Sequence, residues 1–320
     1  MIPALLALLQ APCPAPSGGV RIPTDYLADR WVARVPGPDG KPIRFYLDTG
    51  GGTNMLYRTG TARLGITPDS VAGGPPGAGQ VPAEAVPVPG AFPPFEAHPD
   101  GPVRLLVPPP NPQFEQETDG PMDGFLGRTW FADRAWTFDY PARALHYHAS
   151  LSGGGPDRCW VPLGFQTDSA GRRTTHFPRV EASVDGETLQ FLFDTGAMTT
   201  LTDSALALLP GGPGRRGTSF ITASVVERWR TKHPDWRYLP RAETGTGAAM
   251  IEVPEVVIGG VTVGPVWFTV RPDRAFHDFM SQWMDRKLDG ALGGSAFREL
   301  SVTIDYPGAR AMFVKPAAGR

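Results

Sequence analysis

The sequence has few cysteines, few charged residues and no long apolar run. Its two cysteines, Cys13 and Cys159, are too few for a disulfide framework. Charged residues make up only 19% of the chain, and 30 basic residues against 32 acidic ones give a net charge of −2. Such a chain lacks the basic field that attracts a phosphate backbone. No stretch reaches the roughly 18 apolar residues that span a bilayer. We therefore expect neither nucleic-acid binding nor a membrane span.

Glycine and proline, in contrast, are abundant. The 320 residues include 39 glycines and 36 prolines, and this much turn chemistry favours many short strands over long helices. Apolar residues make up 41% of the chain, enough for two hydrophobic cores. The length suits two domains of roughly 100–200 residues each. The composition therefore predicts a mainly β, loop-rich protein of two domains.

The first 17 residues have some features of a signal peptide. Residues 1–9 are apolar apart from one proline, and Ala15-Pro16-Ser17 offers a small-x-small cleavage pattern. No lysine or arginine precedes Arg21, however, so the positive start of a signal peptide is missing. We expect residues 1–17 to direct export to the periplasm or the exterior, which would leave Cys159 as a buried or incidental thiol. The alternatives are a disordered apolar tail or a misplaced start codon, and the protein would then be cytoplasmic.

An internal repeat is the most informative feature of the chain. Residues 45–50 (Phe-Tyr-Leu-Asp-Thr-Gly) recur 146 positions later as residues 191–196 (Phe-Leu-Phe-Asp-Thr-Gly). Two further pairs of segments lie 166 positions apart: 122–127 with 288–293, and 137–141 with 303–307. The second copy therefore holds about 20 extra residues.

A pair of glycine-rich turns helps to place the extra residues. Gly77-Ala-Gly79 and Gly245-Thr-Gly247 lie 168 positions apart, so the insertion falls between Asp194 and Gly245. Apolar spacing within 220–238 indicates a partly helical segment there. We expect this helix to be the inserted element.

The duplication predicts two similar lobes. We expect an N-terminal lobe at 18–150, a glycine-rich linker at 151–156 and a C-terminal lobe at 157–320. Each lobe should hold one short helix, at 127–136 and at 294–301. An Asp-Gly turn between apolar runs is a strong hairpin signal. It predicts strand pairs at 31–35 with 43–47 and at 180–184 with 189–193.

Each residue of the repeated Asp-Thr-Gly motif suits a turn that presents a carboxylate. An apolar strand that ends in this motif presents the carboxylates of Asp48 and Asp194 at a turn. Gly50 and Gly196 let the chain reverse and bring a backbone N–H close to the carboxylate. Thr49 and Thr195 are small enough to be buried and can hydrogen-bond across to each other. One such turn is a weak signal, but two with matched downstream segments are a strong one.

These motifs resemble those of the aspartic peptidases, specifically the bacterial retropepsin-like proteins with two fused retroviral-type units. The resemblance rests on both Asp-Thr-Gly turns, on Phe125-Leu126-Gly127 and Ala291-Leu292-Gly293, and on the Asp-Tyr-Pro strands, and it covers residues 31–314. It implies a bilobal acid-protease fold of two duplicated β-barrel lobes with short helices and a cleft between them. It also implies that Leu126 and Leu292 are buried supports of a ψ-shaped loop.

The resemblance implies an aspartic endopeptidase with Asp48 and Asp194 as the catalytic pair. Two carboxylates about 3 Å apart share one proton, so one can activate water while the other polarises the scissile carbonyl. This chemistry needs no metal and no cofactor. The expected partner is an extended peptide or protein, bound by a monomer with pseudo-twofold symmetry. Gly77, Gly79, Gly245 and Gly247 are candidate flap residues because closing hairpins need flexible turns.

One departure from the pepsin pattern affects the expected pH dependence. Gly51 and Ala197 stand where pepsin-like enzymes usually have a hydroxyl residue that hydrogen-bonds the aspartate. Such a hydroxyl favours the ionised carboxylate and lowers its pKa. Its absence predicts an optimum at mildly acidic pH. Serine at position 51 or 197 should shift the profile towards acid.

Two other functions remain as alternatives. His146 and His148 share a strand face and could ligate a metal, but no third ligand lies nearby in the sequence, so surface histidines are favoured. The same fold could also serve as a catalytically inactive peptide-binding or scaffold protein, because fold does not guarantee activity. Loss of peptide cleavage on replacing either aspartate would separate enzyme from scaffold.

Overall fold

The protein is mainly β, as its composition predicts. The structure, a computed structural model, describes residues 13–71, 76–87, 92–93, 103–111, 115–117, 120–151, 156–209 and 211–316. The expected signal segment up to residue 12 and most of the expected linker lie outside these residues. No described helix is both long and apolar enough to cross a membrane.

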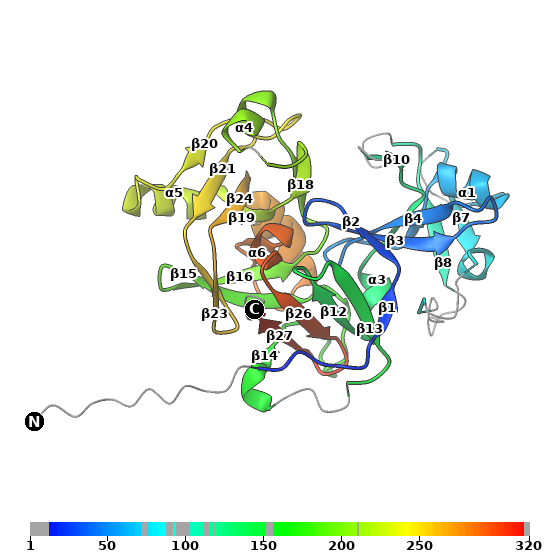
Figure 1. Cartoon of the computed structure of the whole chain (residues 1–320), viewed down its shortest axis with the longest axis horizontal. Helices are drawn as coiled ribbons and strands as arrows, with labels where there is room; N and C mark the ends of the chain where they lie inside the picture. The colour runs from blue at the N-terminus through cyan, green and yellow to red at the C-terminus, as the bar shows by residue number, and fades with distance from the viewer. Residues whose placement is uncertain are drawn as a thin grey trace, which may run out of the picture.

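Each lobe has one large sheet, and a third sheet joins the lobes (Figure 1). In spatial order, the first-lobe sheet contains β2 (Thr24–Tyr26), β3 (Trp31–Pro36), β4 (Pro42–Leu47), β11 (Gly124–Leu126), β5 (Met55–Leu56), β8 (Arg104–Val107), β7 (Gly79–Pro82) and β6 (Asp69–Ser70). The second-lobe sheet contains β20 (Tyr238–Leu239), β21 (Met250–Val253), β24 (Val266–Arg271), β19 (Ser219–Thr222), β25 (Gly290–Leu292), β16 (Glu187–Phe193), β15 (Arg179–Val184), β22 (Val256–Ile258) and β23 (Val261–Val263).

The third sheet takes strands from both lobes and lies between them in Figure 1. Its order is β1 (Val20–Ile22), β13 (Ala144–His148), β12 (Ala135–Asp139), β26 (Ser301–Asp305), β27 (Arg310–Val314) and β14 (Val161–Pro162). The two Asp-Tyr-Pro segments end β12 and β26, which pair antiparallel with Thr137 opposite Thr303. This sheet therefore carries the pseudo-twofold relation between the two copies.

The remaining described elements are short. Two small ribbons pair β9 (Gln116–Glu117) with β10 (Gly120–Pro121) and β17 (Met198–Thr200) with β18 (Arg215–Gly217). The helices are α1 (Arg58–Leu64), α3 (Arg128–Phe131), α4 (Asp203–Leu208), α5 (Ala223–Lys232), α6 (Gly294–Phe297), η1 (Ala83–Ala85), η2 (Asp157–Cys159), η3 (Ala275–Phe279) and η4 (Met280–Trp283). The short helices α3 and α6 lie where the sequence predicts them, directly after β11 and β25.

The expected β-rich, two-lobe fold is present, but neither lobe forms a closed barrel within the described residues. Within the described residues, the first-lobe sheet has free ends at β2 and β6, and the second-lobe sheet has free ends at β20 and β23. The third sheet supplies the reason, because its side chains join one core with those of both lobes. The Phe138 ring lies 6.0 Å from that of Trp31 and 6.4 Å from that of Phe193. Each lobe thus buries its inner face without closing on itself.

The inserted segment lies earlier than the sequence predicts. Met55 on β5 pairs opposite Phe125, and Phe220 on β19 pairs opposite Ala291, so β5 and β19 are counterparts. Met55 lies 7 positions after Asp48, whereas Phe220 lies 26 positions after Asp194. The extra residues therefore form β17, α4 and β18. The predicted helix exists as α5, but it follows β19 as α1 follows β5, so it belongs to the repeat and is not the insertion.

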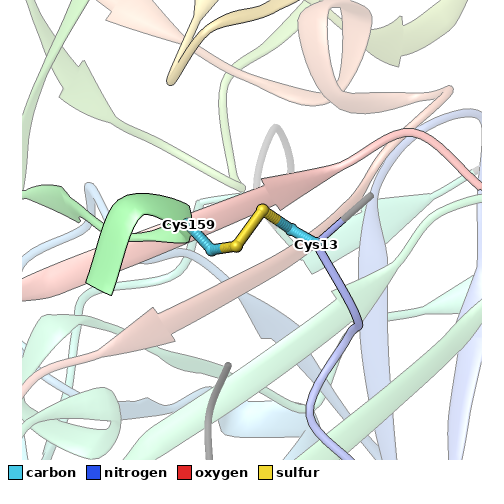
Figure 2. Close-up of a disulfide and its surroundings, with 2 residues drawn as sticks. All are labelled: Cys13 and Cys159. Carbon is cyan, nitrogen blue, oxygen red and sulfur yellow. A yellow bond between two sulfur atoms is a disulfide. The ribbon is translucent and has the colours of Figure 1, made fainter. Parts of the chain in front are cut away.

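A disulfide joins Cys13 to Cys159 (Figure 2). It ties the segment before β1 to η2 at the start of the second lobe, across 146 positions. The expectation that Cys159 is a buried or incidental thiol is therefore wrong. The pairing was missed because Cys13 falls in the segment expected to be removed, although the two cysteines are separated by the same 146-position offset as the Asp-Thr-Gly repeat. The bond is compatible with an exported protein, since disulfides persist in oxidising compartments. It requires Cys13 in the mature chain, which cleavage at residue 17 would remove.

We expect Cys159→Ser to lower the free energy of unfolding by about 3–5 kcal/mol, because the lost bond closes a long loop in the unfolded chain. Urea unfolding with and without a thiol reductant measures this. Reductant should bring the parent to the stability of the variant and leave the variant unchanged. A parent whose stability does not change on full reduction, verified by mass spectrometry, would contradict the prediction.

Candidate active site

The two Asp-Thr-Gly turns have equivalent strand supports. β4 pairs parallel with β11, and β16 pairs parallel with β25. The backbone N–H of Asp48 donates to the Leu126 carbonyl at 3.0 Å, and that of Asp194 donates to the Leu292 carbonyl at 2.9 Å. Leu126 and Leu292 are fully buried, as the sequence predicts. Each aspartate is thus held at the end of a buried strand by its own apolar-apolar-glycine segment.

Two further supports were not predicted from the sequence. Asn54 accepts a hydrogen bond from the Gly127 N–H at 2.9 Å through its side-chain oxygen. At the equivalent point of the second lobe, the Ser219 hydroxyl accepts from the Gly293 N–H at 3.1 Å. Their residue types differ and the insertion precedes Ser219, so the repeat did not align them. Both fix the glycine that follows the ψ-loop strand.

Thr49 and Thr195 interlock the two turns. The Thr195 N–H donates to the Thr49 hydroxyl at 3.0 Å, and the Thr49 N–H donates to the Thr195 hydroxyl at 3.1 Å. Each hydroxyl also donates to a carbonyl of the opposite lobe: Thr49 to Phe193 at 2.8 Å, and Thr195 to Leu47 at 3.4 Å. Neither threonine is exposed. This reciprocal pattern holds the two Asp-Thr-Gly turns in register with each other.

We expect Thr49→Val to lower the free energy of unfolding by about 2–4 kcal/mol, because valine keeps the shape but leaves a buried N–H and a buried carbonyl without a partner. Thr49→Ser is the matched control. It keeps the hydroxyl and removes only a methyl group, which is worth about 1 kcal/mol. Urea unfolding compares the two. A valine variant as stable as the serine variant would show that the interlock contributes nothing.

The glycines of the two turns bring the carboxylates together. A Cβ atom on Gly50 would lie 2.6 Å from the Asp194 carboxyl carbon, and one on Gly196 would lie 2.1 Å from that of Asp48. Each turn therefore packs directly against the opposite aspartate. Each carboxyl also shifts the pKa of the other, so the two lie close enough to interact. The structure thus brings together all six residues that the sequence predicts for the dyad and its support.

Burial and their mutual interaction shift the pKa values of both aspartates. Burial raises the pKa of Asp48 well above its ordinary value, and the Asp194 charge raises it further. Burial also raises the pKa of Asp194, while the Asp48 carboxyl and the N–H groups of Gly196 and Ala197 oppose the rise by favouring the ionised form. The Gly196 N–H to Asp194 distance is 3.0 Å. The N–H groups of Gly50 and Gly51 oppose the rise of the Asp48 pKa in the same way. The two carboxyls therefore form a coupled pair that holds one proton, and the apparent pKa values belong to the pair.

The positions after the two glycines differ in the space they offer. A Cβ atom on Gly51 would lie 2.2 Å from the Phe125 ring, so the ring occupies the place of a side chain there. Serine at position 51 is therefore sterically unsuitable as a test of the missing hydroxyl. Ala197 is buried and already has a Cβ atom, so Ala197→Ser is the usable variant.

Two small apolar clusters share the face of the strands from which the aspartates emerge. Successive strand residues point to opposite faces. Phe45 and Leu47 enter the main core while Tyr46 does not, and Leu192 alternates with Phe191 and Phe193 in the same way. The first-lobe cluster comprises Val32, Tyr46, Tyr57 and Met122, with Leu27, Met55, Phe125 and Met198 packed against it. The second-lobe cluster comprises Phe177, Leu192, Phe276, Met284, Leu288 and Ala291, with Phe220, Ala275, Met280 and Trp283 packed against it.

The candidate flap glycines lie in equivalent hairpins. Gly77 and Gly79 belong to the β6–β7 hairpin, and Gly245 and Gly247 lie between β20 and β21. Gly77, Gly245 and Gly247 are exposed and have positive φ values of 82°, 86° and 68°. Gly79 is buried within β7, where a Cβ atom would meet Pro68 at 2.8 Å, so this residue is a strand position and not a hinge. Residues 72–75, between β6 and Gly77, lie outside the described part.

His146 and His148, the candidate metal ligands on β13, differ in their surroundings. The His148 ring is buried and forms a 2.8 Å hydrogen bond with the Thr137 hydroxyl, which in turn bonds Thr303. Only His146 retains partial exposure, so the expectation of two surface histidines is wrong for His148. Among the described residues, no group of three potential ligands could hold a metal.

Comparison with known proteins gives little help. No family model and no curated protein matches the chain. Among solved structures, conglutin gamma, described as a unique basic 7S globulin from lupine seeds, is similar over 93% of this chain and 94% of its own. The sequences are 10% identical and the TM-score is 0.46. So distant a likeness carries no argument, and the function rests on the chain's own residues.

Proposed function

We propose that the protein is an aspartic endopeptidase that hydrolyses peptide bonds with a water activated by Asp48 and Asp194. The observation that carries this proposal is that two interlocked, duplicated turns pack each against the aspartate of the other, which brings the two carboxylates together. Like charges in such contact cannot both ionise, so the pair retains one proton across a range of pH. A base and an acid then face the same point.

In this proposal Asp194 is the general base and Asp48 the general acid. Asp194, which the Gly196 N–H helps to keep ionised, takes a proton from water as its oxygen attacks the scissile carbonyl carbon. Asp48 gives its proton to the carbonyl oxygen, which yields a neutral tetrahedral diol. The carbon–nitrogen bond then breaks as the leaving amine takes the proton held by Asp194, and Asp48 recovers its proton from the diol. The Asp48 Oδ1 atom is buried and has no hydrogen-bond partner among the described residues, so it is available for this exchange.

The surroundings suit an extended, partly apolar peptide. The first-lobe and second-lobe clusters flank the dyad on the face where the carboxylates emerge. An extended peptide directs alternate side chains to opposite sides, so adjacent residues would meet the two clusters in turn. We therefore expect apolar residues next to the scissile bond. In this proposal the protein is exported and acts as a monomer.

We expect peptide cleavage to follow a bell-shaped pH profile with a mildly acidic optimum. Activity rises as Asp194 loses its proton and falls as Asp48 loses its own, and both pKa values are raised by burial. A peptide-library cleavage profile at several pH values measures this and identifies substrates. Ala197→Ser should move the acidic limb to lower pH if the new hydroxyl donates to Asp194. An optimum near pH 2 in the parent would contradict the argument.

The same library distinguishes an enzyme from a peptide-binding scaffold. A scaffold would bind peptides that the parent does not cleave at any pH. Cleavage that depends on both aspartates supports the enzyme.

A further inference from the structure

Arg128 lies beside the catalytic turn of the first lobe. It opens α3 directly after the ψ-loop strand, and its backbone N–H donates to the Gly51 carbonyl at 3.2 Å. A Cβ atom on Gly52 would lie 3.8 Å from one guanidinium nitrogen of Arg128. The guanidinium also stacks over the Phe177 ring of the second lobe at 4.3 Å. A cation thus lies between the turn that carries Asp48 and the second-lobe apolar cluster.

This guanidinium has no counter-charge within the described part of the chain. No hydrogen bond or ion pair of the Arg128 side chain is present there, and burial alone lowers its pKa. The side chain is half-buried, and none of its nitrogens is a fully buried atom without a partner, so solvent reaches them. Arg128 is therefore both accessible and unpaired.

Arg271 shows the contrast. It stacks over Phe220 of the same cluster at 4.3 Å, but Glu243 binds it through two hydrogen bonds of 2.6 and 2.9 Å. Both arginines stack on a ring of the second-lobe cluster, but the described residues supply a carboxylate to Arg271 and none to Arg128. A half-buried cation without a partner gains more from an arriving carboxylate than an exposed one does.

The turn next to Arg128 has a glycine where an acidic side chain could have paired with the guanidinium. A side chain at position 52, four residues after Asp48, would meet the guanidinium, but Gly52 presents none. In the second copy the counterpart of Arg128 is Gly294, which packs against the Asp29 carbonyl. The second copy therefore has no arginine at the equivalent position, so Arg128 would distinguish one end of a bound peptide from the other.

We propose that Arg128 is a specificity-determining residue that binds the carboxylate of an acidic side chain in the substrate, near the scissile bond on one side. This inference rests on the proposed peptidase function. The substrate class is then a peptide with apolar residues at the cleaved bond and a glutamate or aspartate close by. The carboxylate forms charge-assisted hydrogen bonds with the guanidinium, and the cation–π contact with Phe177 holds the guanidinium in place.

The test compares peptides that differ in one residue. A fluorogenic peptide cleaved by the parent receives Glu, Gln or Lys at each of three positions on either side of the scissile bond. We expect the parent to prefer Glu over Gln at one position by about tenfold to a hundredfold in kcat/KM, the value of a hydrogen-bonded charge pair. Arg128→Gln should bring this ratio close to one, and Arg128→Glu should turn it into a preference for Lys. The ratio is measured within each variant, so losses common to all peptides cancel.

Arg230→Gln is the matched control. Arg230 also stacks over an aromatic ring, that of Tyr238 at 4.1 Å, but it lies on the exposed face of α5. Its replacement should leave the Glu-to-Gln ratio unchanged. A parent that cleaves peptides without any preference for Glu, or an Arg128→Gln variant that keeps the preference, would overturn the inference and leave the peptidase standing.

Binding separates the two proposals if no peptide is cleaved. Fluorescence anisotropy with the Asp48→Asn variant measures binding of labelled Glu and Gln forms of the same peptides. Tighter binding of the Glu form that disappears with Arg128→Gln supports the arginine site even if the parent lacks turnover. Equal binding of both forms, together with no turnover, would overturn both proposals.

Discussion

Replacing Asp48 or Asp194 with asparagine is expected to lower kcat/KM for peptide cleavage by at least about a thousandfold. General acid and base groups contribute 10²–10⁴-fold each, and either substitution removes one of the two. Asparagine has nearly the same shape, so the interlocked turns should remain. Kinetics with the best library peptide measures the loss, and Asp235→Asn, at an exposed position, is the control. Retention of more than a tenth of the parent activity by either variant would refute the shared-dyad mechanism.

Asp48→Asn should also stabilise the fold at neutral pH. The pKa of Asp48 in the folded protein is raised above its ordinary value of 3.8, so the protonated carboxyl favours the folded state. That stabilisation is fully present below pH 3.8 and is lost as the pH rises through the folded-state pKa. The neutral amide of Asp48→Asn escapes this loss. Between pH 3.8 and the folded-state pKa of Asp48, the free energy of unfolding of the variant should rise relative to that of the parent by about 1.4 kcal/mol per pH unit.

Urea unfolding of parent and Asp48→Asn at pH 3.5 and pH 7 measures this effect. We expect the two proteins to be similar at the lower pH and the variant to be more stable at the higher pH. A variant less stable than the parent at pH 7 would mean that Asp48 is ionised without cost, and the assignment of the proton to Asp48 would be wrong.

Gly196→Ala is expected to abolish cleavage while it leaves most of the fold intact. The new methyl group would lie 2.1 Å from the Asp48 carboxyl carbon, closer than any real contact, so the two carboxylates must move apart. Overpacking of this kind costs about 1–3 kcal/mol of stability. We expect a loss of more than about a hundredfold in kcat/KM, since small displacements of reacting groups have effects of that size. Separation also weakens the coupling of the two carboxylates, so the pH profile of any residual activity should narrow.

Gly214→Ala is the matched control for this substitution. A Cβ atom on Gly214 would meet nothing within 4 Å, and its backbone does not require positive φ. Its activity and stability should equal those of the parent. If Gly196→Ala retained normal turnover and an unchanged pH profile, the close packing of the turn against Asp48 would have no functional role.

The sequence alone determined the local parts of this protein. The Asp-Gly turns predicted both hairpins, and in the second the structure gives Asp185 and Gly186 φ values of 51° and 81°, which suit a two-residue turn. The repeat predicted which strand each aspartate ends and which buried leucine supports it. These features depend on residues adjacent in sequence or repeated at a fixed offset, so one chain is enough to reveal them.

Only the tertiary structure decided the features that depend on contacts between distant residues. The Phe125 ring against Gly51 and the stacking of Arg128 on Phe177 involve partners that no periodicity relates. The Cys13–Cys159 bond spans the 146-residue offset of the repeat, but that offset alone does not show that the two cysteines meet. The place of the insertion required strand pairing, because Met55 and Phe220 are equivalent by register and not by sequence. The lobe sheets remain open because a third sheet, assembled from both copies, covers their inner faces. Turn and strand signals act over a few residues, whereas packing selects among the arrangements that those signals allow.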